Sequence, residues 1–288
     1  MARPSKKRPR PTTPKTPTPP EVHGPMAKTG GVVRILNCIP SRDVGKDWQF
    51  EHAVAAGLVA AVAIPQAKDL RETWWEMGDQ GSTGSCVGWA LADSVLRWHF
   101  VKANRLGQGE PLSPRYIWMA SKETDEFVDR PTTFIEEDGT SLKAALDVAR
   151  KYGVVPDSIL PFASGKLYQE KLEVFYAMAA QRRITSYINL GRNPSKWRQW
   201  IATKGPILTR LDCDSVWMNA KSTGGRLEVY DSASADGGHA VAMVGYDANM
   251  FIIRNSWGVT HWGDKGFGYA SNGYARDAFT EAYGVNLA

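Results

Sequence analysis

The spacing of apolar side chains divides this chain into two regions with different periods. Between residues 84 and 203, apolar side chains recur every three or four positions, which predicts amphipathic helices. After residue 206 the period falls to two, and glycines separate short apolar runs, which predicts strands. A helical part followed by a strand-rich part, without regular alternation, predicts an α+β fold with two lobes and a cleft between them.

Local signals give the approximate limits of these elements. Ser113 before Pro114 and Asn193 before Pro194 are typical of helix starts, because proline at the first helical position gives up no hydrogen bond. Gly153 is typical of a helix end. The predicted helices cover residues 85–100, 113–122, 140–153 and 193–205, and the predicted strands cover 206–213, 239–247, 251–258 and 266–271.

The N-terminal segment differs from the rest in composition. Residues 1–30 contain eight of the 17 prolines and seven basic side chains against one acidic side chain, so we predict a disordered tail. The net charge of +5 lies in this tail. Because the rest of the chain is nearly balanced and shows no readout motif, we do not predict nucleic-acid binding.

Residues 31–65 are predicted to form an N-terminal arm, and residues 66–288 the main domain. The arm holds an apolar run at 53–64, which is shorter than the ~20 residues of a membrane span and is predicted to be buried. We expect this arm to be structural rather than a cleaved segment, although it is long enough to cover the cleft. The chain is expected to be a monomer.

The cysteines and the N-terminus bear on location and cofactors. The three cysteines, Cys38, Cys86 and Cys213, show no paired spacing, which favours a reducing compartment. No secretory signal opens the sequence, so we expect a cytoplasmic protein, with export by a non-standard signal as the alternative. No cluster has metal-ligand spacing, and neither a metal nor a cofactor is predicted.

The segment DQGSTGSCVGWA, residues 79–90, holds a candidate nucleophile. Cys86 is placed at the start of a predicted helix, where unpaired N–H groups and the helix dipole lower the pKa of a thiol. Gln80 and the Cys86 N–H can donate to an oxyanion, and the nearby glycines, Gly84 among them, leave room for a substrate backbone. Taken alone, a cysteine in this position is more often a small buried side chain than a nucleophile.

A reactive thiolate needs an imidazole partner, and His239 is the preferred one. It begins a predicted strand directly after Gly238, whereas the other histidines lie in the tail, in the arm, far along the helix of Cys86 or in a polar loop. Asn255, at the end of the next strand, can orient the imidazole, and Trp257 can shield their hydrogen bond.

Together these segments resemble the papain-like cysteine peptidases. The resemblance is carried by QGSTGSC at 80–86, HAVAMVGYD at 239–247 and NSWGVTHWGDKGFGYAS at 255–271, and it covers about residues 66–275. It implies the two-lobed papain fold, with Cys86 as nucleophile, His239 as acid and base, Asn255 as orienting residue and Gln80 as oxyanion donor. The substrate-binding residues that it implies are Gly84, Ser85, Gly139, Thr140, Gly238 and Trp257.

The sequence also departs from the family pattern. Val87 stands in place of a tryptophan, Thr140 in place of a glycine and Thr83 in place of a disulfide cysteine. The leading hypothesis is a cysteine endopeptidase acting on peptides or proteins. The alternatives are an aminopeptidase, a peptide ligase or a deamidase on the same scaffold, and a catalytically silent binding module.

Overall fold

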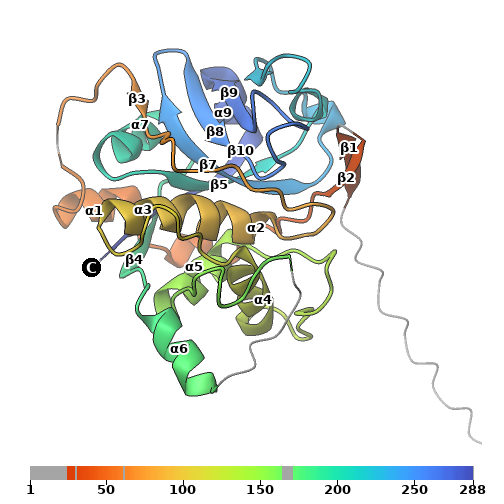
Figure 1. Ribbon diagram of the computed structural model, residues 1–288. Coiled ribbons are helices and arrows are strands. Elements are labelled where there is room, and N and C mark those ends of the chain that lie inside the picture. Colours follow the sequence, from red (N-terminus) through yellow and green to blue (C-terminus); the bar gives the residue numbers. More distant parts are fainter. Residues whose placement is uncertain (1–24, 30, 61, 164–170, 288) are drawn as a thin grey trace, which may run out of the picture.

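A continuous helix runs between a helical lobe and a strand-rich lobe (Figure 1). The computed structural model describes residues 25–29, 31–60, 62–163 and 171–287. The central helix consists of α2 (Cys86–Gly88), the π-helical η2 (Trp89–Leu96) and α3 (Arg97–Lys102). It is buried along most of its length, so it belongs to the core that both lobes share.

The helical lobe lies on one side of the central helix. It contains α4 (Pro114–Thr124), α5 (Leu142–Lys151) and α6 (Leu172–Ala180). Helix α4 contacts both α5 and α2. The side chains of Ser113 and Ser141 accept hydrogen bonds from N–H groups in the first turns of α4 and α5, which fixes where these helices begin.

The strand-rich lobe is built on an eight-stranded sheet. Seven strands follow the order β4-β10-β5-β7-β8-β9-β6, and β3 pairs with β7. The strands are β3 (Lys68–Asp69), β4 (Ser186–Asn189), β5 (Ile207–Asp212), β6 (Arg226–Leu227), β7 (Gly238–Tyr246), β8 (Met250–Arg254), β9 (Phe267–Ser271) and β10 (Phe279–Asn286). The accompanying helices are α7 (Pro194–Thr203), α8 (Ser215–Met218), η3 (Ser232–Ser234) and α9 (Asn272–Ala278).

Every residue of β7 is buried, and its side chains alternate between two hydrophobic clusters. Ala240, Ala242 and Val244 pack with the central helix and the helical lobe, whereas Val241 and Met243 pack with α7 and α9 on the other side. Two packed lobes of this kind confirm the predicted α+β, two-lobed fold. The four predicted helices and the four predicted strands are all present, and α6, α9, β4 and β10 are elements that the periodicity did not predict.

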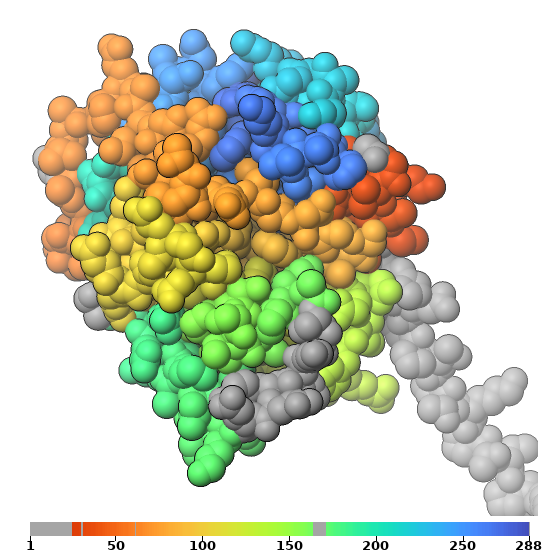
Figure 2. All heavy atoms as spheres, viewed as in Figure 1, coloured from red at the N-terminus to blue at the C-terminus, as the bar shows by residue number. Residues whose placement is uncertain are grey.

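The N-terminal arm wraps around both lobes. It contains β2 (Val32–Ile35), η1 (Val44–Lys46) and α1 (Phe50–Ala55), and β1 (Met26–Thr29) lies just before it. Four of its side chains enter the hydrophobic core of the strand-rich lobe: Leu36, Phe50, Ala53 and Val59. In Figure 2 the helical lobe occupies the lower end of the molecule and the strand-rich lobe the upper end, with the β1–β2 hairpin at one side.

Two predictions about the N-terminal part were wrong. The apolar run at 53–64 is mainly a surface segment, because Gly57 ends α1 with a positive φ of 69° and Val54, Val62 and Ile64 are exposed. Residues 26–29, placed in the disordered tail, form β1 because they pair in register with β2, and Thr29 donates to the carbonyl of Met218. The remaining tail residues, 1–24 and 30, lie outside the described residues.

Gly88 lets the central helix approach α4 closely. A Cβ at this position would overlap the carbonyl oxygen of Pro114 and lie 2.9 Å from the Cβ of Trp118. We therefore expect Gly88→Ala to lower the free energy of unfolding by about 1–3 kcal/mol through overpacking, despite the better helix propensity of alanine. Gly273→Ala in α9 is the matched control, since its Cβ would meet only Ser271 at 3.8 Å. Urea unfolding measures both, and equal midpoints would contradict the prediction.

Candidate active site

Cys86 lies at the N-terminus of the central helix, facing the strand-rich lobe. It is fully buried, and the backbone N–H of Ala240 in β7 contributes to lowering the pKa of its thiol. The loop before it is held by packing: a Cβ at Gly84 would lie 2.5 Å from the carbonyl oxygen of Glu137. Ser85 is buried, and its hydroxyl is 2.6 Å from that of Thr83. The thiol is thus held in place by its own loop, by the segment around Glu137 and by β7 of the strand-rich lobe.

His239 and Asn255 lie at neighbouring ends of strands β7 and β8. Nε2 of His239 is 2.7 Å from Oδ1 of Asn255, and both residues are buried. Since an amide oxygen only accepts hydrogen bonds, Nε2 carries the proton of this bond. The other ring nitrogen, Nδ1, has no hydrogen-bond partner of ordinary geometry among the described residues, which leaves it for the sulfur of Cys86.

The pKa of the Cys86 thiol is held well below its usual value. The neighbouring Cys38 thiol lowers it most, burial opposes this, and the neighbouring imidazole of His239 lowers it further. In contrast, burial raises the pKa values of Cys38 and Cys213 well above the usual range. Of the three cysteines, Cys86 alone is in an environment that favours the thiolate.

Aromatic side chains enclose the imidazole. The ring of Trp257 is 4.8 Å from that of His239, and the ring of Trp217 is 5.7 Å away, centroid to centroid. Trp262 packs on Trp217 at 4.3 Å and donates to its backbone carbonyl. All three tryptophans are fully buried, so water is kept from the bond between His239 and Asn255. Sequence analysis identified Trp257 but missed Trp217, which no motif distinguishes.

Gln80 joins the cysteine loop to the asparagine turn. Its Nε2 donates to the carbonyl of Thr83 at 2.9 Å, and its Oε1 accepts from the hydroxyl of Ser256 at 2.8 Å. Its backbone N–H donates to the carbonyl of Ser256 at 2.9 Å. The amide nitrogen retains a second hydrogen, so Gln80 can still donate to an oxyanion next to Cys86.

The N-terminal arm passes directly through this site. The N–H of Cys38 donates to the carbonyl of Gly238 at 2.9 Å, and the N–H of Ile39 donates to the carbonyl of Thr140 at 3.1 Å. Gly238 belongs to the strand-rich lobe and Thr140 to the helical lobe. An extended stretch of the arm therefore bridges the two lobes next to the cysteine.

Two glycines, which have no side chain, leave room for the arm. A Cβ at Gly139 would overlap the carbonyl oxygen of Asn37, and one at Gly238 would overlap that of Cys38. Of the predicted substrate-binding residues, Gly139, Thr140 and Gly238 thus touch the arm in this structure. The sequence indicated that this segment was long enough to cover the cleft, but not which residues fill it.

Two buried arginines anchor the arm. Arg34 pairs with Asp79 at 2.5 Å and donates to the carbonyl of Trp257 at 3.1 Å, and its side chain has no exposed surface. Arg210, in β5, donates from Nε to the carbonyl of Cys38 at 2.9 Å. Neither was singled out in the sequence, because each acts on a residue that is distant along the chain.

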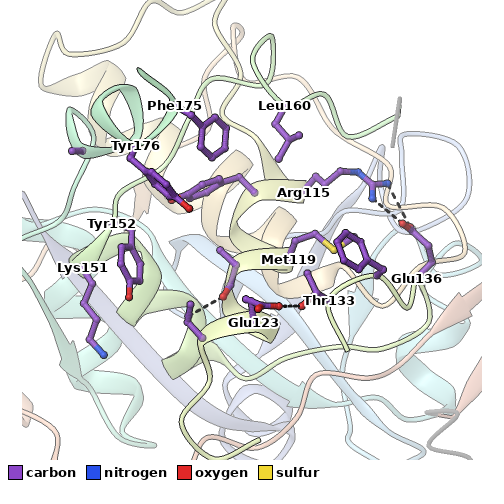
Figure 3. A pocket seen from close by; sticks show the side chains of 15 residues that line it. Arg115, Met119, Glu123, Thr133, Glu136, Lys151, Tyr152, Leu160, Phe175 and Tyr176 are labelled. Carbon is purple, nitrogen blue, oxygen red and sulfur yellow. Dashed lines mark hydrogen bonds and ion pairs between the residues drawn. The ribbon is translucent and has the colours of Figure 1, made fainter. Parts of the chain in front are cut away.

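Other histidines and a large cavity lie away from this site. His99 is buried near the end of α3, and burial lowers its pKa to about 4. His52 accepts from the N–H of Gln49, and His23 lies outside the described residues. A cavity of about 860 Å³ in the helical lobe is lined by α4, α5 and α6, with Tyr116, Phe175 and Tyr176 around it (Figure 3). None of the candidate catalytic residues lines it.

A thiol at a helix N-terminus, facing an imidazole with an amide partner across two lobes, defines a cysteine hydrolase of two-lobed fold. Residues 64–283 match the papain family of cysteine proteases, and the chain belongs to this family. It is a cysteine-type peptidase, as predicted, and the predicted family resemblance is confirmed. In the described part of the chain, no helix is long and apolar enough to cross a membrane.

Two relatives from Giardia intestinalis are similar over most of the chain. Cathepsin B-like CP3 is 28% identical over 235 residues, covering 75% of this chain and 72% of its own length. Cathepsin B-like CP2 is 28% identical over 227 residues, covering 71% and 68%.

Solved structures share the fold. Xylellain, a cysteine protease from Xylella fastidiosa, superposes with a TM-score of 0.72 at 22% identity, covering 88% of this chain and 97% of xylellain. Digestive procathepsin L 3 of Tenebrio molitor gives a TM-score of 0.62 at 17% identity, covering 88% and 77%.

Proposed function

We propose that this protein is an endopeptidase that works through Cys86, His239 and Asn255. The observation that carries the proposal is the bond of 2.7 Å between His239 and Asn255, which leaves Nδ1 of His239 for a thiol whose pKa is lowered. The Cys86 thiolate attacks the peptide carbonyl, and the backbone N–H of Cys86 and the amide of Gln80 hold the oxyanion. His239 then protonates the leaving amine, and water hydrolyses the thioester.

The course of the arm favours internal cleavage over trimming of chain ends. The arm enters the cleft before residue 37 and leaves it after residue 39, continuing in both directions. A groove that admits the middle of a chain accepts a substrate with residues on both sides of the scissile bond. The carbonyls of Thr140 and Gly238, which bind the arm, are the groups we assign to the substrate backbone, with Gly139 leaving space between them. Gly84, Ser85 and Trp257 shape the cleft next to Cys86.

The arm does not present a scissile carbonyl to the nucleophile. The side chain of Cys38 is the neighbour that lowers the pKa of the Cys86 thiol most. The arm must therefore leave the cleft before a substrate can enter. Its departure breaks the backbone bonds to Gly238 and Thr140, each worth about 0.5–1.5 kcal/mol, and the bond from Arg210 to the Cys38 carbonyl.

Digestion of an unfolded protein, with products resolved by mass, tests this function. We expect internal cuts by the reduced full chain, and faster cutting by Ile39→Pro, which lacks the N–H that binds Thr140. Ile39→Ala is the matched control, because it keeps the N–H and changes only a side chain that is 40% exposed.

Other outcomes identify the alternatives. Release of terminal residues only would indicate an exopeptidase, joined peptides a ligase, and conversion of glutamine side chains a deamidase. Folded protein that gives no product with either variant would indicate a silent binding module and would contradict the proposal.

A further inference from the structure

We propose that Cys38 and Cys86 form a reversible disulfide that fixes the arm in the active site. The inference concerns a modification of the thiols, so it does not depend on which peptides the enzyme cleaves. It rests on the position of Cys38, on its proximity to Cys86 and on the difference between their environments.

Backbone contacts on both sides hold Cys38 over the nucleophile. Its N–H donates to Gly238 at 2.9 Å, its carbonyl accepts from Arg210 at 2.9 Å, and the next N–H donates to Thr140 at 3.1 Å. The residue is 2% exposed, and its side chain is in the same hydrophobic cluster as Cys86. The thiol therefore points inward rather than to solvent.

The two thiols are neighbours in one buried cluster, and their surroundings act on them in opposite directions. Cys38 is the neighbour that lowers the pKa of Cys86 most, whereas burial raises the pKa of Cys38. A thiolate beside a protonated thiol is a suitable pair for disulfide formation, because the thiolate reacts first and the thiol resolves the product. Cys213 is also buried, but it packs in the other hydrophobic cluster.

Hydrogen peroxide is the class of oxidant that fits this closed site, since it is hardly larger than water. The Cys86 thiolate attacks one peroxide oxygen, the O–O bond breaks, and Cys86 becomes a sulfenic acid while hydroxide leaves. The hydroxide takes a proton from the imidazolium of His239 and becomes water. The Cys38 sulfur then attacks the Cys86 sulfur, an S–S bond replaces the S–O bond, and the departing hydroxide leaves as water with the Cys38 proton. Two thiols are oxidised, and one peroxide is reduced to two waters.

The disulfide would attach the arm to the active site covalently, where hydrogen bonds alone hold it in the reduced protein. The arm could then no longer leave the cleft, so substrate would be excluded until a thiol reductant restored both cysteines. Cys86 would also be protected, because a disulfide does not proceed to the irreversible sulfinic and sulfonic acids. The catalytic cysteine would thereby be stored in a recoverable form.

Intact mass and peptide mapping of the full chain after titration with hydrogen peroxide test the proposal. We expect the reduced wild type to lose two hydrogens, to yield a Cys38–Cys86 cross-linked peptide, and to regain free thiols with dithiothreitol. In Cys38→Ser, which retains a hydrogen-bond donor, we expect Cys86 to gain oxygen atoms and to stay oxidised after reduction. Cys213→Ala should behave like the wild type.

The opposing results are equally distinct. Sulfinic acid at Cys86 of the wild type with Cys38 still free, a bridge between two molecules, or no change in either thiol would each overturn the proposal. Cys38→Ala is the second variant should the serine variant fail to fold. Because the readout is covalent mass, an inactive but cross-linked protein would contradict the proposed function and leave this inference standing.

Discussion

Replacing Cys86 by alanine is expected to lower kcat for peptide hydrolysis by about 10⁶-fold, the loss seen when a hydrolase loses its nucleophile. The reason is that neither of the other two cysteines can replace it: the pKa values of Cys38 and Cys213 are both raised, and Cys213 packs in a separate cluster. The measurement is turnover of a fluorogenic peptide by reduced protein in the Ile39→Pro background, so that the arm does not limit the rate.

Cys213→Ala is the control for the loss of a buried thiol. Cys213 is 1% exposed, and its side chain packs in the hydrophobic cluster of the strand-rich lobe rather than in the cluster that contains Cys86. We expect full activity with a small loss of stability. Peptide hydrolysis that survived in Cys86→Ala would refute the assignment of the nucleophile, whatever the other variants showed.

Replacing His239 by alanine is expected to lower kcat by at least about 10⁴-fold, since the leaving amine then lacks its proton donor. The variant should also change the pH dependence of the thiol. His239 lowers the pKa of Cys86, so its removal raises that pKa, and the thiolate appears only at higher pH. The alkylation rate of Cys86, followed by mass against pH, should shift its rise toward alkaline pH.

Asn255→Ala provides a graded comparison within the same site. It removes one bond of 2.7 Å to the imidazole but leaves the imidazole in place. A hydrogen bond to a charged group contributes about 1.5–3 kcal/mol, so we expect a loss of about 10- to 150-fold in kcat. For the His239→Ala variant, an alkylation rate of Cys86 that rises at the same pH as in the wild type would contradict the prediction, because it would show that His239 does not lower the pKa of the thiol.

Much of the fold follows from local sequence. The four predicted helices and four predicted strands form because their periods, caps and glycines all favour the same local structure. Several of the elements that were missed are strands that depend on pairing. β4 and β10 are strands because they pair with each other and with β5, and β1 is a strand because β2 lies beside it. Pairing of this kind adds hydrogen bonds that no local period reveals.

The apolar run at 53–64 shows the opposite limit. Its composition predicts burial, yet many of its residues are alanines, which bury little area each, and the segment crosses the surface after Gly57. Hydrophobicity by itself does not say which apolar segments reach the core. The hydrophobic core of the strand-rich lobe is filled mainly by its own helices and strands. Of the described residues in the segment 50–64, only Phe50, Ala53 and Val59 are buried in it.

The sequence by itself determined the fold class, the family and the four residue types of the candidate site. The reason is that the thiol, the imidazole and the two amides each lie in a short motif that can be identified without the structure. Only the tertiary structure decided that Trp217 packs on His239, that Arg34 and Arg210 anchor the arm, and that Cys38 meets Cys86 inside the cleft. These contacts join residues far apart in the chain. They form because the two lobes and the arm pack closely against one another. Local sequence pattern does not reveal which distant segments will pack together.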